Sequence, residues 1–362
     1  MSYERENIKR LKAYTPGEQP RAAEIIKLNT NENPYPPVEA IMHSLTEVQG
    51  EQLRKYPPAT AQEFRDSAAK AHDVQSSQII ATNGSDELLR LAITCYCEPS
   101  GDTEGTQGGL GLTDPTYSLY NVLANIHDTP MFVVPLEDEY AMPADLAKQW
   151  NDAGCKLAMI VNPHAPSGRA YSLDQIKQIA SDFNGIIIVD EAYADFAEED
   201  AVELVKENSG FDNVLISRTL SKGYSLAGLR FGYGIAPAPI IDTLDKARDS
   251  YNTDYISQKL ATAAINARED VAKSWDKVKS ERSRVEKALV AMGYKVYPSQ
   301  TNFLLAMPPV DAPDAETIYQ KLAEKYIFIR HFDHPNMCDK IRISMGTPAQ
   351  NDALLKALEE LK

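Results

Sequence analysis

Lys222 stands in a segment whose residue types suit covalent chemistry on a phosphorylated aldehyde. Hydroxyl groups flank the lysine, Thr219 and Ser221 just before it, and Arg230 follows eight residues later. A neutral lysine amine attacks an aldehyde to form a Schiff base, while hydroxyls and a guanidinium hold a phosphate. By itself such a lysine is usually a solvated surface charge, so it has to be weighed together with other segments.

Asp190 directly follows the aliphatic residues 186–189, which predicts a nearly buried carboxylate. Such a group needs a cationic or hydrogen-bonding partner, and Tyr193 lies within reach three residues later. A carboxylate at a strand end could also bind a metal, but the histidines offer no ligand cluster at convincing spacing. The nearest approach to such a cluster comprises His331, His334 and Cys338. We therefore predict no metal site.

Two further segments place polar groups where a predicted strand ends. Gly84, Ser85 and Asp86 open a helix, whose free backbone amides favour an anion such as phosphate. The alternative for this segment is an ordinary helix cap on Ser85. Asn162 follows another strand, in a proline-rich turn at the position where open α/β sheets bind ligands, although turn chemistry alone also explains it.

The elements that must position these residues alternate between β-rich runs and amphipathic helices, which indicates an α/β fold with a largely parallel sheet flanked by helices. Strands are predicted at residues 78–81, 131–134, 157–161, 185–190, 214–217 and 230–235, with helices at 86–96 and 173–183. The glycine-rich residues 101–111 are predicted to form a loop.

The last third of the chain has a different pattern, typical of a smaller α+β domain. One long helix is predicted over residues 257–292, then strands at 301–307 and 340–344 and a helix at 349–361. The change of pattern places a domain boundary near residues 247–256.

Composition excludes several classes of function. The 362 residues include 37 Lys and Arg against 52 Asp and Glu, a net charge of −15, which argues against a nucleic-acid binder. No apolar run approaches the length of a membrane span, and the polar N-terminus does not resemble a secretory signal. Four cysteines are too few for a disulfide framework, so we expect a cytoplasmic protein with reduced thiols.

Taken together, these segments resemble the signatures of fold-type I pyridoxal-phosphate aminotransferases, and most of all the histidinol-phosphate aminotransferase branch. Seven segments carry the resemblance, in the family's order: NENPY at 31–35, PTY at 115–117, the turn at Asn162, DEAY at 190–193, TLSK at 219–222, AGLR at 227–230 and IRISMGT at 341–347. One such motif would be weak support, but seven in order are strong.

The resemblance implies pyridoxal 5'-phosphate as the cofactor. Lys222 would bond to its aldehyde and later shuttle a proton, and Asp190 would pair with the pyridinium nitrogen. Tyr193 and Asn162 would hydrogen-bond the phenolic oxygen, and Tyr117 would stack on the ring. The phosphate would be held by Gly84, Ser85, Asp86, Thr219, Ser221 and Arg230, provided that the acidic side chains of Asp86 and Glu87 point away.

The resemblance also implies the substrate contacts. Arg342 would bind a carboxylate and Arg330 a substrate phosphate, with Asn33 and Asn162 nearby. Tyr14 and Tyr56 would touch the substrate phosphate, Tyr56 from the neighbouring subunit of a homodimer. The implied domains are an N-terminal arm (1–34) packing on the small domain, a large cofactor-binding domain (35–248) and a small C-terminal domain (249–362).

The implied reaction belongs to histidine biosynthesis: histidinol phosphate and 2-oxoglutarate give imidazole-acetol phosphate and glutamate. His164 and Ala165 depart from the family's usual turn, and residues 101–114 form a longer segment than usual, so specificity is the most open point. An aromatic or broad-specificity aminotransferase and a threonine-phosphate decarboxylase remain alternatives. A cofactor-sensing regulator would need a DNA-binding module, for which we see no candidate segment in this acidic sequence. A Rossmann dehydrogenase would need its glycine motif, which the sequence does not show.

Overall fold

The structure is a computed structural model that describes residues 3–14, 25–100 and 107–361. The helices are α1 (Glu6–Arg10), α2 (Glu39–Thr46), α3 (Gly50–Leu53), α4 (Gln62–His72), α5 (Ser85–Tyr96), α6 (Leu119–His127), α7 (Leu146–Asp152), α8 (Leu173–Asp182), α9 (Ala238–Ala247), α10 (Tyr255–Asn266), α11 (Arg268–Ala291), α12 (Ala315–Glu324) and α13 (Pro348–Glu359). The strands are β1 (Ile26–Lys27), β2 (Ile79–Thr82), β3 (Leu110–Asp114), β4 (Met131–Pro135), β5 (Leu157–Val161), β6 (Ile186–Asp190), β7 (Val214–Thr219), β8 (Gly232–Ile235), β9 (Lys295–Val296), β10 (Phe303–Met307), β11 (Ile327–Phe328), β12 (Arg330–His331) and β13 (Ile341–Ser344).

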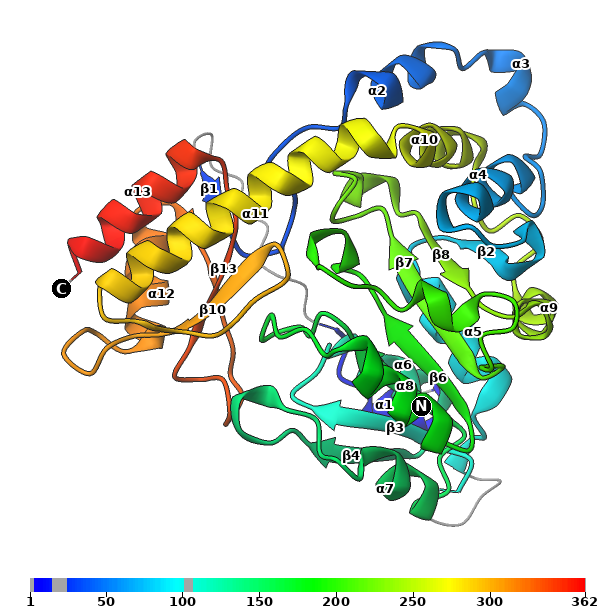
Figure 1. Ribbon diagram of the computed structural model, residues 1–362, viewed down its shortest axis with the longest axis horizontal. Coiled ribbons are helices and arrows are strands. Elements are labelled where there is room, and N and C mark those ends of the chain that lie inside the picture. The colour runs from blue at the N-terminus through cyan, green and yellow to red at the C-terminus, as the bar shows by residue number, and fades with distance from the viewer. Residues whose placement is uncertain (1–2, 15–24, 101–106, 362) are drawn as a thin grey trace.

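The larger sheet has the strand order β2-β8-β7-β6-β5-β3-β4, and only β8 runs antiparallel to its neighbours. Helices flank the sheet (Figure 1), and β5 and β7 are buried along their whole length, as strands covered on both faces are. The register pairs Val161 with Asp190 and Asp190 with Ser217. The carboxyl ends of β5, β6 and β7 therefore meet at one edge, which confirms the predicted parallel α/β fold.

The C-terminal part forms a four-stranded antiparallel sheet in the order β12-β13-β10-β9, next to helices α12 and α13 (Figure 1). The N-terminal segment joins this part, because β1 pairs with β11 and the Ser344 amide donates to the Leu28 carbonyl at 2.9 Å. Helix α11 runs from this region toward the larger sheet (Figure 1). It packs against α13 at one side and against the short turn at Ala194–Phe196 at the other.

One predicted element is wrong at its end and another is divided in two. Residues 101–106 of the expected glycine-rich loop lie outside the described residues and residues 107–108 are a turn, but Leu110 and Gly111 belong to strand β3 inside the larger sheet. The reason is steric: a Cβ on Gly111 would lie 2.8 Å from the Trp150 ring, so glycine here makes room for a buried tryptophan. The expected long helix is two helices, α10 and α11, separated at Ala267. The break lets α10 pack on α2 and α4 while α11 leaves in its own direction.

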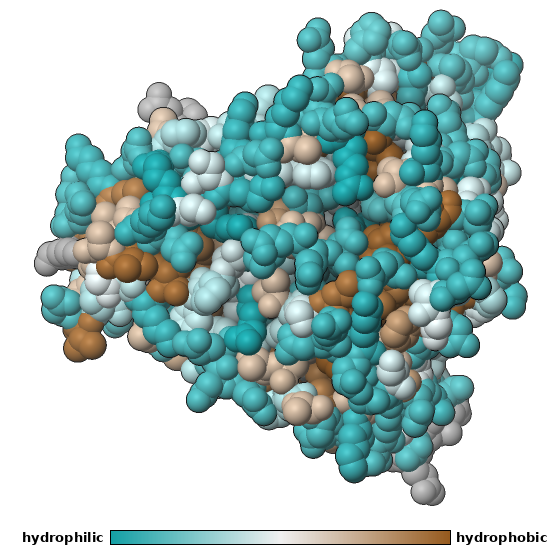
Figure 2. Space-filling view, viewed as in Figure 1, coloured by the Kyte–Doolittle hydropathy of each residue, from teal (hydrophilic) through white to brown (hydrophobic). Residues whose placement is uncertain are grey.

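Polar side chains cover most of the face seen in Figure 2, and apolar residues form only small patches between them. Within the described part of the chain, no helix has the length and apolar character needed to cross a membrane. The same residues contain no cluster of histidine, cysteine or acidic side chains that could hold a metal. His331 instead contacts the Cys338 carbonyl, and His334 contacts Asp114.

A buried ionic cluster lies next to the carboxyl ends of β6 and β7. Arg218 forms ion pairs with Glu191 at 2.7 Å and Asp200 at 2.8 Å, and Asp195 lies 3.8 Å away. Burial raises the pKa of Glu191 to about 7 although Arg218 opposes the rise. The guanidinium therefore compensates carboxylates that would otherwise be buried without a partner.

We expect Arg218→Met to lower the free energy of unfolding by about 3–5 kcal/mol, because it leaves buried carboxylates without their cation. The loss should shrink as the pH falls from 8 to 5, since protonation removes the uncompensated charge. Urea denaturation at both pH values measures this. Arg54→Met, which removes an exposed ion pair with Glu51, should leave the urea midpoint nearly unchanged. Equal effects of the two substitutions would contradict the prediction.

Candidate active site

Asp190 ends strand β6 as a buried carboxylate with a specific donor. The hydroxyl of Tyr120, which is itself fully buried on α6, donates to Asp190 Oδ2 at 2.6 Å, and the Ala192 amide lies 3.3 Å from Oδ1. Burial raises the pKa of Asp190 to about 6, while the Tyr120 hydrogen bond lowers it. Burial therefore favours the protonated carboxyl, whereas the Tyr120 hydrogen bond favours the ionised form.

Lys222 lies in the loop after β7, half-buried, and its Nζ donates to the Thr30 carbonyl at 3.1 Å. Burial, together with the positive charges of Arg342 and Arg230, lowers the pKa of Lys222 to about 8. Both effects favour the neutral amine, which is the nucleophilic form. Nζ also lies 6.0 Å from the centre of the Tyr193 ring, so the lysine reaches the same site as the segment after Asp190.

The N-terminal segment closes one side of this site. Asn31 Nδ2 donates to the Tyr193 hydroxyl at 2.9 Å, and Asn31 Oδ1 accepts from the Ser344 hydroxyl at 2.9 Å. Tyr193 is buried and packs edge-on against Phe303. One asparagine therefore links the larger sheet, through Tyr193, to the smaller sheet, through Ser344.

A cradle for an anion lies where α5 begins. Gly84 caps the helix without a side-chain hydrogen bond, which leaves the first amides, those of Ser85 and Asp86 among them, without a side-chain cap. The hydroxyls of Thr219 and Ser221 lie 2.9 Å apart, and Arg230 Nη1 lies 3.5 Å from the Ser221 hydroxyl. Amides, hydroxyls and a guanidinium converge here, as phosphate binding requires.

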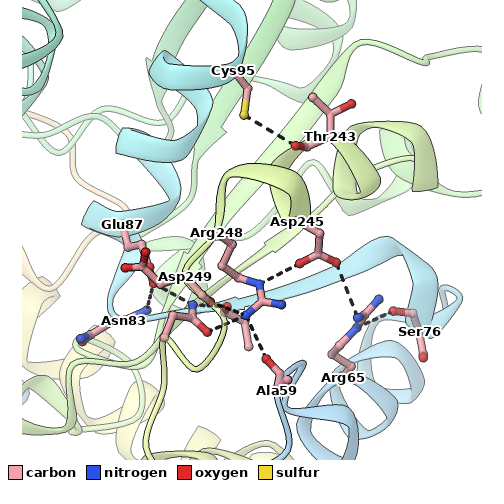
Figure 3. A network of polar contacts seen from close by, with 12 residues as sticks. Ala59, Arg65, Ser76, Asn83, Glu87, Cys95, Thr243, Asp245, Arg248 and Asp249 are labelled. Carbon is pink, nitrogen blue, oxygen red and sulfur yellow. Dashed lines mark hydrogen bonds and ion pairs between the residues drawn. The ribbon is translucent and has the colours of Figure 1, made fainter.

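The two acidic residues of this helix turn in different directions. Glu87 points away from the cradle: its Oε2 accepts from the Asn83 amide and from Asn252 at 2.8 Å, within the polar network around Arg248 (Figure 3). Asp86 instead forms an ion pair with Arg230 at 3.2 Å. The expected orientation holds for Glu87, whereas the Asp86 carboxylate faces the guanidinium.

Two arginines lie side by side on the smaller sheet. Arg330 on β12 pairs in register with Arg342 on β13. The Arg342 guanidinium lies 5.0 Å from the Phe303 ring and donates to the Asn29 carbonyl at 3.1 Å. Its Nε is buried and has no hydrogen-bond partner among the described residues, and burial lowers its pKa to about 10. A buried donor of this kind is suited to a carboxylate or phosphate ligand.

The remaining aromatic candidates separate into two places. Tyr117 lies edge-on to Tyr120 and to Tyr14, with ring centres 5.5 Å and 6.1 Å away. It therefore packs beside the tyrosine that binds Asp190, and burial raises its pKa well above the usual range. Tyr56 has 80% of its surface exposed and stacks on Tyr251 at 4.5 Å, so it belongs to the outer surface of this chain.

The two asparagine candidates already have backbone partners. Asn162 Nδ2 donates to the Tyr171 carbonyl at 3.1 Å and its Oδ1 accepts from the Tyr171 amide at 2.9 Å. One Nδ2 hydrogen remains for a ligand. Asn33 Nδ2 lies 3.2 Å from the Gly223 carbonyl, and its Oδ1 accepts from the Tyr35 amide. Asn33 thus contacts the lysine loop.

Sequence reasoning missed Tyr120, Thr30 and Asn31 as contacts of the central residues. Tyr120 lies in the first turn of α6, and its contact with Asp190, 70 residues away, follows from the packing of α6 on the sheet rather than from any local spacing. Thr30 contributes a backbone carbonyl, which no residue type reveals. Asn31 was only part of a motif, and nothing in its spacing distinguishes it from Asn33.

Comparisons with known proteins agree with this geometry. A family model described as aminotransferase class I and II matches residues 23–358. Histidinol-phosphate aminotransferase 1 of Trichormus variabilis is 41% identical over 362 residues, covering 99% of each chain. Histidinol-phosphate aminotransferase of Microcystis aeruginosa is 39% identical and covers 99% of this chain and 98% of its own. The crystal structure of histidinol-phosphate aminotransferase from Sinorhizobium meliloti in complex with pyridoxal-5'-phosphate has a TM-score of 0.83 at 25% identity, covering 92% of this chain and 90% of that one.

The chain belongs to the class I and II aminotransferases. The fold type inferred from the resemblance is confirmed, as is pyridoxal phosphate as the cofactor. The residues present fit that group: a Cβ on Gly84 would lie 2.9 Å from Arg230 Nη2, so the cradle is kept open by glycine. The buried carboxyl of Asp190 and the half-buried amine of Lys222 are suited to the ring nitrogen and the aldehyde of that group.

We expect Tyr120→Phe to weaken binding of pyridoxal phosphate, because Asp190 loses the donor that lowers its pKa and is less ionised near neutrality. The affinity should be roughly tenfold lower at pH 6, and the difference should shrink toward pH 8, where the carboxyl is ionised in both proteins. Absorbance titrations with the cofactor at several pH values measure this.

Tyr233→Phe is the matched control, since it removes a buried tyrosine hydroxyl that contacts His72 rather than Asp190. Its cofactor affinity should follow that of the unaltered protein at every pH. A pH-independent loss in Tyr120→Phe would show that the hydroxyl acts only through packing.

Proposed function

We propose that this enzyme transfers the amino group of histidinol phosphate to 2-oxoglutarate, giving imidazole-acetol phosphate and glutamate in histidine biosynthesis. The carrying observation is that Lys222 and Asp190, whose pKa values both shift toward neutrality, are presented at one edge of the sheet. The names of the full-length relatives support this substrate pair. The neighbouring Arg330 and Arg342 support one substrate that carries a phosphate and one that carries a carboxylate.

The proposed roles follow from the chemistry of each side chain. When bound, pyridoxal phosphate supplies an electron sink that stabilises negative charge on the substrate carbon. Asp190, as a carboxylate, would keep the ring nitrogen protonated, and Tyr193 and Asn162 would donate to the ring oxygen. Tyr117 would pack against the ring. Lys222 would hold the aldehyde group through Nζ, and its free amine would carry a proton to or from the substrate carbon.

The anion sites divide between the two sheets. In the proposal, the amides of Gly84, Ser85 and Asp86, the hydroxyls of Thr219 and Ser221, and Arg230 bind the cofactor phosphate. The ion pair between Asp86 and Arg230 then has to break so that Arg230 can bind that phosphate. Arg342 binds the carboxylate of the oxo acid, and Arg330, with Tyr14, binds the phosphate of the amino donor. Asn33 supports the site through the lysine loop.

We further propose a cytoplasmic homodimer in which Tyr56 completes the neighbouring subunit's site. The high exposure of Tyr56 and its stacking on Tyr251 support this, because an exposed aromatic pair suits an interface. We also retain the division into an arm (1–34), a large domain (35–248) and a small domain (249–362). The separate seven-stranded and four-stranded sheets support it, although α10 packs on α2 and α4 of the large part.

Lys222→Ala should still bind pyridoxal phosphate but should no longer be labelled covalently when borohydride is added. In the unaltered protein, the rate of covalent capture should rise about tenfold per pH unit up to a pH of about 8 and then level off, because only the neutral amine attacks. Stopped-flow absorbance gives the rate, and mass spectrometry gives the labelled residue.

Lys259→Ala serves as the control, because Lys259 is paired with Glu47 at the surface and should not affect capture. Labelling of Lys222→Ala at another lysine, with unchanged kinetics, would remove Lys222 from its proposed role.

Arg330→Gln should lower kcat/KM for histidinol phosphate by roughly 10–100-fold, because a charge-assisted contact with the substrate phosphate is lost. The half-reaction with glutamate should change much less, since Arg342 is intact. Each half-reaction is followed by the cofactor absorbance. Arg54→Gln, at a surface ion pair, should leave both half-reactions unchanged.

The same assays separate the alternatives. Preference for phenylalanine or tyrosine over histidinol phosphate would favour an aromatic aminotransferase. Release of carbon dioxide from threonine phosphate would favour the decarboxylase. In both cases Lys222, Asp190 and the phosphate cradle would keep their roles, and only the function of Arg330 would change.

A further inference from the structure

The residue after the central lysine is held by two donors from outside its own loop. The Gly223 carbonyl accepts from the Trp275 indole Nε1 at 2.8 Å and from Asn33 Nδ2 at 3.2 Å. Trp275 lies on α11 and is 7% exposed. Asn33 also contacts the neighbouring Ser274 at 3.4 Å. Helix α11 and the N-terminal segment therefore converge on one carbonyl, a single peptide unit from Lys222.

The loop is restrained on its other sides as well. A side chain on Gly223 would collide with the Asp195 carboxylate, so the backbone passes close against the turn that follows Tyr193. Tyr224 packs edge-on against Trp275, with ring centres 5.6 Å apart. Leu226 donates its amide to the Leu220 carbonyl at 3.1 Å, which closes the loop on itself. These contacts fix the backbone, whereas Nζ of Lys222 makes its hydrogen bond to the Thr30 carbonyl at 3.1 Å.

We propose that Trp275 is a positioning residue for the reaction: its indole N–H fixes the Gly223 carbonyl and thereby the backbone from which Lys222 reaches the cofactor. This inference rests on the proposed role of Lys222 but not on the identity of the amino donor. The lysine side chain has to move between a bonded and a free state during the reaction. Lys222 can reach the reacting atoms in both states only if the backbone that carries it stays in place.

The hydrogen bond between Trp275 and Gly223 also connects the two parts of the molecule. Helix α11 packs against α13 and β10 of the smaller sheet at one side and against the turn at Ala194–Phe196 at the other. The Trp275–Gly223 hydrogen bond therefore ties the lysine loop to the element that carries the smaller sheet. Arg342, which belongs to that sheet, is then held in a fixed relation to Lys222.

The test compares Trp275→Phe with Trp150→Phe, which changes the other of the two tryptophans in the chain. Both indoles are buried and both donate to a backbone carbonyl, but Trp150 donates to Leu112 at 3.4 Å, in strand β3. Each holoenzyme is loaded with pyridoxal phosphate. Its visible absorbance is then titrated against pH, and kcat and KM are measured together with the melting temperature.

We expect Trp275→Phe to move the midpoint of the absorbance titration by roughly half a pH unit and to lower kcat roughly three- to tenfold, with KM nearly unchanged. Trp150→Phe should lower the melting temperature without moving the midpoint. The proposal is overturned if the two variants share the same titration midpoint and kcat. It is also overturned if Trp275→Phe changes only KM or only stability.

Asn33→Ala provides a second route should Trp275→Phe fail to fold, because it removes the other donor to the same carbonyl. It should shift the midpoint in the same direction by a smaller amount. In the double variant, the two effects should not add, since both act on one group. An unshifted midpoint in Asn33→Ala, or strictly additive effects, would contradict the proposal. If the unaltered protein, loaded with pyridoxal phosphate, showed no absorbance from a lysine–cofactor bond, the proposed function itself would be refuted.

Discussion

The parallel pairing of β5, β6 and β7 is the constraint on which the site depends. The register sets Val161 beside Asp190 and Asp190 beside Ser217, so the segments that follow all leave the same edge of the sheet. Alternation of side chains along a strand then sends consecutive residues to opposite faces. Asp190 faces Tyr120 and the site, while Glu191 faces Arg218 in the buried ionic cluster. A slip of one residue would exchange the two carboxylates and leave each with the wrong partner.

Burial acts on the two central groups in opposite directions. It raises the pKa of Asp190 to about 6 and lowers that of Lys222 to about 8, because desolvation disfavours both charged forms. The hydrogen bond from Tyr120 opposes the rise in the pKa of Asp190. The positive charges of Arg342 and Arg230 disfavour the protonated form of Lys222. The site is therefore suited to a ligand that brings a ring cation to Asp190 and an anion to Arg230. Such a ligand supplies the charges that the protein alone leaves incompletely compensated.

Local sequence patterns predicted most of the fold because strands covered on both faces are nearly all apolar and their helices are amphipathic. They failed where a long-range contact decides the outcome. Gly111 suggests a loop until Trp150 is known to fill the space of its side chain, and the break at Ala267 reflects where α10 and α11 pack. Motif order predicted Asp190, Lys222 and Arg230 as site residues, but Thr30 contacts Lys222 through its backbone, which residue type does not encode.

The N-terminal segment shows why the site cannot be assigned to one sheet alone. Thr30 receives the Lys222 hydrogen bond, and Asn31 binds both Tyr193 and Ser344. The carbonyl of Asn29, one residue earlier, accepts from Arg342. Three consecutive residues thus contact the lysine, the tyrosine beside it and the arginine on the smaller sheet. Because a short segment has little freedom once its groups are bonded, a shift of the smaller sheet is expected to displace the partners of Lys222 as well.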